Sequence, residues 1–444
     1  MFEIGRELRR FFAPARPRDG LCLGDSSLLE LLDLRLLRDE VRSADVAAGR
    51  IGVLDKAQRL IEASAVRREL ARRTGDLAAL RKAASCAEQA AEIFRAERRR
   101  GALAQAVCAQ AEVALTGAAL FGEDSLNAAA SFLIGQVPAS PMTQAIQARL
   151  AARRALGAGE AEEVEAAARK LDAPLAELAA RTRADGGHVL ALLRAERAEF
   201  LMSSGARLRE PRLIEAALAD LARAAGGLDS AYQPLTFARI EELRGLCLLR
   251  LGELAGEVAT ILDGVDALTA AIELIAPDHS PLDWARCNHS LGLALMALGE
   301  AGSSAVAFDR ALQAFGKAQT VVEDAHALAL RTMVVQDRAA CVVRRAEVVG
   351  DGYALDEAEA ILRGELASQK PAADPVPWAV LQLNLARIYL AQAEVRGHDR
   401  GEGARAGEAL SAALEVFAER GLRSLAIAAD RGLERLRDAA CGAR

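Results

Sequence analysis

Aromatic residues are scarce in this sequence: Phe, Trp and Tyr together make up 4% of its 444 residues, and only two residues are Trp. β-Sandwiches favour aromatic and β-branched residues, so this scarcity argues against them. Ala, Leu, Arg and Glu are abundant instead, and all of them are strong helix formers. The composition therefore predicts a mainly helical chain, long enough for two or three domains or for one long array of repeats.

Cysteine and histidine are few and scattered. The seven cysteines include no CxxC pair, and the five histidines include no HExxH or HxxxH spacing. Isolated cysteines of this kind indicate small buried residues in a reducing compartment. His188, His279 and His398 lie close to Gly, Pro or Asp in expected connections, so we expect them to face solvent. The pattern predicts no metal site and no cofactor.

Strong charge of one sign and long apolar runs are also lacking. The net charge of −6 provides no basic domain for nucleic-acid binding. The longest charge-free run, residues 125–148, is interrupted by Asn, Gln and Pro, so a membrane-spanning helix is not expected. The N-terminus lacks the apolar stretch of a signal peptide. We therefore expect a soluble, cytoplasmic protein.

What the sequence does contain is a long period, detected from its rarest residues. Trp284 and Trp378 each lie eight residues before a small residue, Gly292 and Ala386 respectively. The same spacing separates Phe237 from Gly245, 47 residues before Gly292. Ala-rich composition alone does not place both Trp at one phase, so this spacing indicates internal repeats. The remaining steps of the period fall on Ala151, Ala198 and Ala340.

Each period has the pattern of a helical hairpin. A Pro precedes each of the three aromatic residues, in SPLDWA, DPVPWA and YQPLTFA, and Pro favours the first turn of a helix. A Gly-bearing break and a second helical run follow. An amphipathic hairpin cannot bury its apolar face alone, so we expect the hairpins to stack into a superhelical solenoid.

The repeats resemble the tetratricopeptide repeat (TPR) family. Around Gly292, Leu291 and Gly292 match the Leu-Gly pair of the first helix, and Phe308 matches the aromatic position of the second. The last unit follows the same pattern at Leu385, Ala386, Tyr389, Ala406, Leu410 and Ala413. The period of about 47 exceeds the usual repeat of about 34, so the resemblance is to a long-period variant. It implies an all-α solenoid of stacked antiparallel hairpins in which Trp284 and Trp378 wedge between neighbouring hairpins.

We divide the chain by the clarity of this pattern. Residues 1–50 are expected to form N-terminal amphipathic or capping helices, and residues 51–190 degenerate helical repeats, for which longer repeats of the HEAT type are an alternative. TPR-like repeats follow in residues 191–420. Residues 421–444 are expected to form a C-terminal capping helix.

The first twelve residues, MFEIGRELRRFF, form a basic amphipathic segment. Its apolar and basic members are Phe2, Ile4, Leu8, Phe11 and Phe12 with Arg6, Arg9 and Arg10. Such a helix can cap the first repeat, lie on a membrane surface or bind a partner's groove. We favour the cap and keep a membrane-peripheral location through residues 1–12 as an alternative.

No constellation of catalytic residues emerges, and we do not expect an enzyme. The resemblance places a ligand in the concave groove, which this family builds from the first helix of each hairpin. Candidate groove residues on those helices are Arg239, Arg286, His289, Asp337, Arg344, Arg345, Asn384 and Arg387. Asn384 matches the position at which peptide-binding members carry an Asn that holds the ligand's backbone. The arginines favour an acidic segment through charge-assisted hydrogen bonds.

The sequence therefore predicts a non-enzymatic scaffold or adaptor that binds a protein or peptide partner, with an acidic segment as one form of that partner. A membrane-peripheral assembly factor and a regulatory module of a signalling system are the alternatives. Oligomerisation is compatible with each of these three functions.

Overall fold

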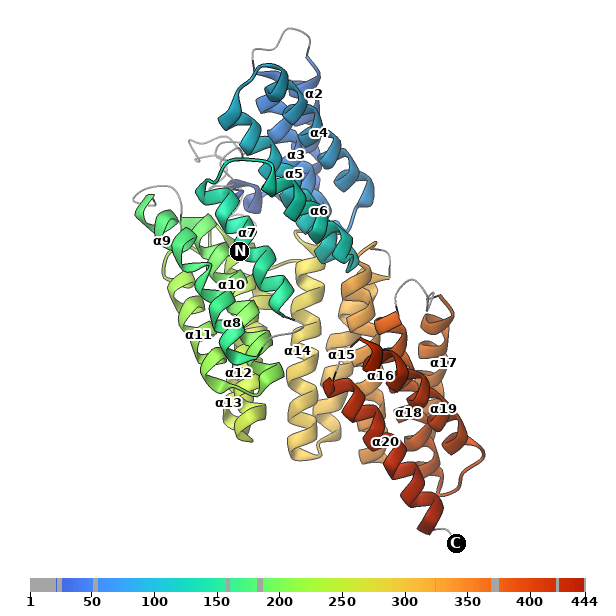
Figure 1. The fold of residues 1–444 in the computed structure, drawn as a ribbon. Helices are drawn as coiled ribbons and strands as arrows, with labels where there is room; N and C mark the ends of the chain where they lie inside the picture. The colour runs from blue at the N-terminus through green and yellow to red at the C-terminus, as the bar shows by residue number, and fades with distance from the viewer. Residues whose placement is uncertain are drawn as a thin grey trace. The chain divides into compact units, whose positions relative to one another are not determined.

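All regular structure in the described part of the chain is helical. The computed structural model describes residue 21 and residues 26–50, 55–156, 160–181, 187–323, 325–368, 375–420 and 423–442. No strand is found in these ranges, and consecutive helices pack against each other in pairs (Figure 1). The predicted all-α solenoid is confirmed.

The helices run through the chain with short connections. A 3-10 helix η2 (Ser27–Leu31) comes before the α helices. These are α2 (Leu34–Gly49), α3 (Lys56–Thr74), α4 (Leu77–Ala96), α5 (Arg100–Phe121), α6 (Asp124–Gly135), α7 (Pro141–Ala155), α8 (Ala161–Arg169), α9 (Asp172–Arg181), α10 (Gly187–Leu208), α11 (Pro211–Ala225), α12 (Pro234–Ala255), α13 (Val258–Glu273), α14 (Pro281–Gly302), α15 (Ala305–Val322), α16 (Leu328–Val349), α17 (Gly352–Ser368), α18 (Pro375–Arg396), α19 (Glu402–Glu419) and α20 (Arg423–Gly442).

The period is visible in the first helix of each hairpin. Helices α10, α12, α14, α16 and α18 begin at residues 187, 234, 281, 328 and 375, so each starts 47 residues after the one before. All five are 22 residues long. In this register the small residue predicted at Gly245, Gly292 and Ala386 is the twelfth of its helix. The twelfth residue of α16 is Ala339, and it is buried. The sequence had predicted Ala340 for this position, one residue too late.

Close packing within a hairpin explains the small residue. At Gly245 in α12, an added Cβ would lie 2.6 Å from Leu268 Cγ and 2.8 Å from the Gly264 carbonyl oxygen in α13. A larger residue would therefore force the two helices apart. At the end of the same helix, Gly256 has φ +69°, a left-handed conformation that terminates a helix at little cost when the residue is Gly.

The helices form two compact units, which we describe separately. Unit 1 comprises Met1–Ala294 and Thr320–Leu330, and unit 2 comprises Leu295–Gln319 and Arg331–Arg444. The buried residues of unit 2 include a large cluster from α16 to α20, with Phe417 and Ala386 fully buried. In unit 1 the buried residues form several successive clusters along the array, as expected when each hairpin packs mainly on its neighbours.

Within the described residues, α5 is the one helix with the length and apolar composition of a membrane span. Half of that stretch is buried by the rest of the structure, a property that core helices share.

Candidate functional site

The candidate groove residues fall on the first helices, divided between the two units. Arg239, Arg286 and His289 belong to unit 1, on α12 and α14. Asp337, Arg344 and Arg345 on α16 and Asn384 and Arg387 on α18 belong to unit 2. Two pairs repeat the 47-residue period: Arg239 with Arg286, and Asp337 with Asn384. The site is therefore built separately in each unit.

In unit 1, Arg239 and Arg286 converge on one buried carboxylate, Glu242 of α12. Glu242 Oε2 accepts hydrogen bonds from Arg239 Nη1 at 2.7 Å and from Arg286 Nε at 2.8 Å. Ser290 Oγ donates to Glu242 Oε1 at 3.0 Å, and Glu242 is 1% exposed. Burial by itself raises the pKa of Glu242, but the two guanidinium charges outweigh it and lower the pKa overall. Both predicted arginines are thus held in place by an acid from the same array.

These contacts are part of a longer series, which we call the ion-pair ring. It joins the helices α3, α5, α7, α10, α12 and α14 in that order and returns to α3. The linking pairs are Arg68–Glu112 (3.2 Å), Glu112–Arg149, Arg149–Glu196 (2.7 Å), Glu199–Arg239 (2.6 Å), Glu242–Arg286 (2.8 Å) and Asp283–Arg72 (2.8 Å). Each helix of the ring is therefore joined to the next one by an ion pair.

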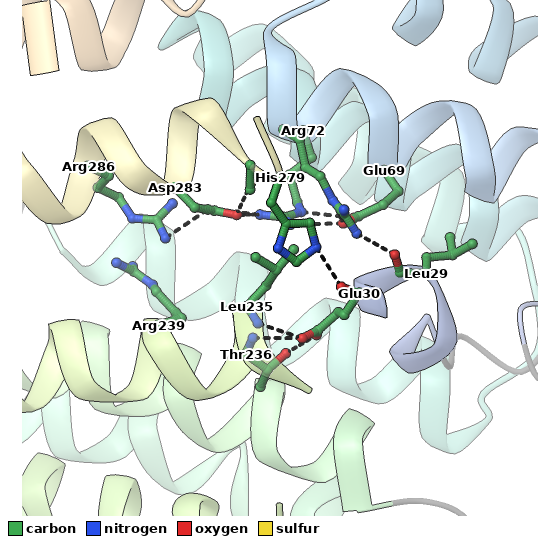
Figure 2. Close-up of polar contacts among 12 residues, drawn as sticks. Leu29, Glu30, Glu69, Arg72, Leu235, Thr236, Arg239, His279, Asp283 and Arg286 are labelled. Carbon is green, nitrogen blue, oxygen red and sulfur yellow. Dashed lines mark hydrogen bonds and ion pairs between the residues drawn. The ribbon is translucent and has the colours of Figure 1, made fainter. Parts of the chain in front are cut away.

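The ring closes between residues 211 positions apart in the sequence. Arg72 Nη1 donates to both carboxylate oxygens of Asp283, at 3.0 and 2.8 Å, while its Nε and Nη2 donate to Glu69, each at 2.9 Å (Figure 2). Burial alone raises the pKa of both acids, but the adjacent arginines reverse the effect. The pKa of Glu69 falls to about 2, and that of Asp283 is held well below its usual value. Both carboxylates are therefore ionised at neutral pH, and bidentate geometry fixes Arg72 between them.

The segment η2 forms hydrogen bonds with α3 and α12, two of the helices that the ion-pair ring joins. Glu30 Oε2 accepts from the backbone N–H groups of Leu235 and Thr236, at 2.9 and 3.0 Å, in the first turn of α12 (Figure 2). It therefore acts as an N-terminal cap supplied from another part of the chain, and its charge complements the helix dipole. Arg73, which is fully buried, donates to the carbonyl oxygens of Leu29 and Leu32, both at 2.7 Å.

Two histidines differ from the prediction. His188 and His279 are 4% and 1% exposed, whereas we expected both to face solvent. Nε2 of His188 lies 2.8 Å from Glu30 Oε1, and Nε2 of His279 lies 2.7 Å from the Glu30 carbonyl oxygen. His188 lies in the first turn of α10, and His279 lies just before α14. Both contact Glu30 of η2, which is more than 150 residues away in the sequence, so no local pattern predicts their burial. His398 is exposed as predicted.

The ring contains both buried side chains and side chains that are partly exposed to solvent. Glu242 and Asp283 are 1% and 3% exposed, whereas Glu196, Glu199 and Arg286 keep 38%, 49% and 29% of their surface. The buried acids hold the arginines in place, whereas the more exposed members of the ring are accessible to solvent. His289 and Asn384 were predicted as ligand contacts, but they are only 5% and 8% exposed, so little of either side chain can meet a ligand.

In unit 2 the predicted arginines also have acidic neighbours, with one exception. Arg344 pairs with Glu300 at 3.2 Å and Glu347 at 3.1 Å, and Arg345 pairs with Asp309 at 2.5 Å. No ion pair of Arg387 is found among the residues that the structure describes, and its side chain is exposed. The surrounding helices, followed by the positive charge of Arg344, lower the pKa of Arg387 from its usual value. Arg387 therefore lies beside the like charge of Arg344, and Glu300 and Glu347 are the acids near both arginines.

The structural repeat positions lie in or beside the hydrophobic clusters. Phe237, Trp284 and Trp378 are half-buried, and Trp284 packs against a cluster that contains Leu235 of α12 and Ala271 of α13. The cluster on which Trp284 packs therefore contains residues of both helices of the preceding hairpin. Gly292, Phe308, Ala386 and Tyr389 are buried, and Gly245 lies at the close approach described above.

Several residues of the ring were missed at the sequence level. Arg72, Glu69, Glu112, Arg149 and Asp283 carry no motif, and each is one charged residue among many on a helical face. One signal was available: opposite charges lie three residues apart on one helix in the pairs Glu69–Arg72, Arg239–Glu242 and Asp283–Arg286, a spacing at which they meet. The long-range partners had no such signal.

Comparisons with known proteins add little to this description. No protein-family model matches the chain, and no curated protein matches it. Among solved structures it is similar to a Rap protein complexed with competence and sporulation factor, at 11% identity and a TM-score of 0.45, over 93% of this chain and 100% of that one. A circular tandem repeat protein with novel repeat topology gives 18% identity and a TM-score of 0.22, over 98% and 94%. Values this low define no family, so the classification as a helical-repeat protein rests on the helices described above.

Proposed function

We propose that the protein is a non-enzymatic scaffold of TPR-like repeats that binds an acidic segment of a protein partner on the first helices of its hairpins. The observation that carries this proposal is the pair Arg344 and Arg387 in unit 2, where Arg387 is exposed beside a like charge. A partner carboxylate between the two guanidinium groups would relieve their repulsion and form charge-assisted hydrogen bonds.

The neighbouring charges set the kind of segment that this site accepts. Glu300 and Glu347 already accept from Arg344, so a ligand must exchange with them or bind chiefly through Arg387. Both acids are partly exposed, at 48% and 35%, and exposed ion pairs are worth at most about 1 kcal/mol. Exchange is therefore cheap, and several carboxylates in succession favour binding more than one does.

A labelled peptide tests the proposal directly. We expect a fluorescein-labelled polyglutamate peptide to bind the full chain in a fluorescence-anisotropy titration, and polylysine of equal length to bind less well. The double substitution Arg344→Glu with Arg387→Glu should weaken polyglutamate binding by about tenfold or more, because attraction becomes repulsion. Added salt should weaken binding to the wild type, since exposed charges are screened within about 10 Å.

The matched control changes net charge equally at another place in unit 2. Arg310 on α15 and Arg435 on α20 are exposed arginines, and Arg310→Glu with Arg435→Glu should leave the affinity within about twofold of the wild type. If both double variants lose affinity equally, the peptide responds to net charge alone and the proposed site is wrong.

A further inference from the structure

Unit 1 contains an apolar groove that lies on α4, α5 and α6, with His326 and Leu328 also in its lining, and that shares no residue with the ion-pair ring. Its volume is about 520 Å³, and apolar side chains supply most of its lining. Leu77, Leu80 and Ala84 line it from α4, at positions three and four residues apart on one helical face. The facing stripe on α5 comprises Val113, Ala114, Gly117 and Phe121, and α6 contributes Leu126 and Leu133.

Small residues are part of the lining of the groove, namely Ala84 on α4 and Ala114 and Gly117 on α5. At Gly117 an added Cβ would lie 2.9 Å from Leu126 Cδ1 and 3.3 Å from Leu80 Cδ2, so the lining is tightly packed at that point. The groove lining extends along α4 from Leu77 to Glu88, which corresponds to about 16 Å of helix.

Acidic side chains lie on the rim. Glu88 on α4 and Glu123, just before α6, both line the groove and are exposed. Arg81 on α4 and His326 also line the groove, and Arg81 is the arginine among its lining residues. An occupant that suits the groove is therefore apolar on one face and basic on the other.

We infer that the occupant is the N-terminal segment of this same chain, residues 2–12. This segment lies outside the described residues, but its sequence has the required chemistry: five large apolar residues and three arginines within eleven positions. As a helix it would be about 16 Å long, which matches the groove. The arginines would lie near Glu88 and Glu123.

The point at which the described chain begins supports this choice. Leu21 is 5% exposed and belongs to the same cluster of buried residues as Leu80 and Val113, both of which also line the groove. Residues 13–20 connect it to the proposed segment and can span up to about 30 Å. The segment can therefore reach the groove without any rearrangement of the described helices.

Limited proteolysis of the full chain tests the inference. Trypsin cleaves after Arg6, Arg9 and Arg10, and mass spectrometry identifies the released N-terminal peptides. Ala84→Trp places an indole in the groove and should accelerate these cleavages by about tenfold or more, because protection reflects the bound fraction. Ala78→Trp is the matched control on the exposed side of α4, outside the groove, and should leave the rates unchanged.

A second variant guards against a folding defect in the first. Glu88→Lys with Glu123→Lys changes exposed rim residues only, and it should also accelerate cleavage while leaving the melting temperature near that of the wild type. Amide hydrogen exchange of residues 3–12 should rise in both groove variants. If cleavage and exchange at these residues are the same in wild type, Ala84→Trp and the double variant, the segment does not occupy the groove and the inference is overturned.

Discussion

Trp284 illustrates what a single large residue does in this fold. It is half-buried and packs on a cluster contributed by both helices of the preceding hairpin. We expect Trp284→Ala to reduce the free energy of unfolding by about 2–4 kcal/mol, somewhat below the value for a fully buried Trp, because the substitution leaves a cavity between hairpins. Urea denaturation followed by far-ultraviolet circular dichroism measures this change.

Phe132 on α6 is the control for that substitution. Its side chain is 72% exposed, so Phe132→Ala should change the free energy of unfolding by no more than about 0.5 kcal/mol. Equal effects of the two substitutions would show that Trp284 does not fill a gap between hairpins.

At the scale of an element, η2 has an effect far larger than its length of five residues suggests. Through Glu30 it caps α12, and we expect Glu30→Gln to destabilise the protein by about 2–4 kcal/mol, because an amide NH2 group would replace an acceptor in a buried site. Amide hydrogen exchange should rise first at Leu235 and Thr236, because the neutral amide oxygen of Gln is a weaker acceptor for their N–H groups than a carboxylate oxygen.

An exposed glutamate on another helix provides the comparison. Glu408 on α19 is of the same residue type, and Glu408→Gln should leave both stability and exchange at Leu235 unchanged, since Glu408 belongs to unit 2. Wild-type protection of Leu235 and Thr236 in Glu30→Gln would mean that the cap contributes nothing to α12.

The starts of several helices could be predicted from the sequence, whereas their long-range contacts could not. Pro234, Pro281 and Pro375 begin their helices, so local backbone preference was enough to locate α12, α14 and α18. Leu328 begins α16 without a Pro, and in that repeat the small residue was predicted one position late. The cap from Glu30 and the ion pair between Arg72 and Asp283 join residues more than 200 positions apart. Partners at that separation depend on how many hairpins lie between them, which no local pattern encodes.

For the whole molecule, the distribution of buried acids predicts unequal sensitivity to acid. In unit 1 the pKa values of Glu69, Asp283, Glu242 and Glu112 are all lowered by arginines, and that of Glu69 falls to about 2. A lowered pKa contributes stability that is present above the unfolded-state value and is lost as pH falls through the folded-state value. Glu69 alone contributes on the order of 3 kcal/mol, lost between about pH 5 and pH 2. In unit 2, lowered carboxyl pKa values are found in the described residues at Asp399 and Glu402.

The two tryptophans allow each unit to be followed separately, because Trp284 belongs to unit 1 and Trp378 to unit 2. With Trp378→Phe, fluorescence reports unit 1, and with Trp284→Phe it reports unit 2. We expect the unit 1 signal to change at a higher pH than the unit 2 signal during acid titration. Adding Glu69→Gln and Asp283→Asn should flatten the pH dependence of unit 1, and identical acid midpoints for the two units would contradict this account.

The closure of the ion-pair ring restricts how this protein could have grown. Open helical arrays lengthen by duplication of a hairpin, since each unit needs only its neighbours. In unit 1, however, Arg72 must meet Asp283 after a fixed number of intervening hairpins. One additional 47-residue module between them would separate Arg72 from Asp283. Among the described residues, the nearly buried Asp283 would then keep only Arg286 as an ion-pair partner, while Glu69 would keep Arg72 and Arg73. A duplicated hairpin at that place would therefore cost the array the ion pair that closes its ring, even if the new hairpin itself folded.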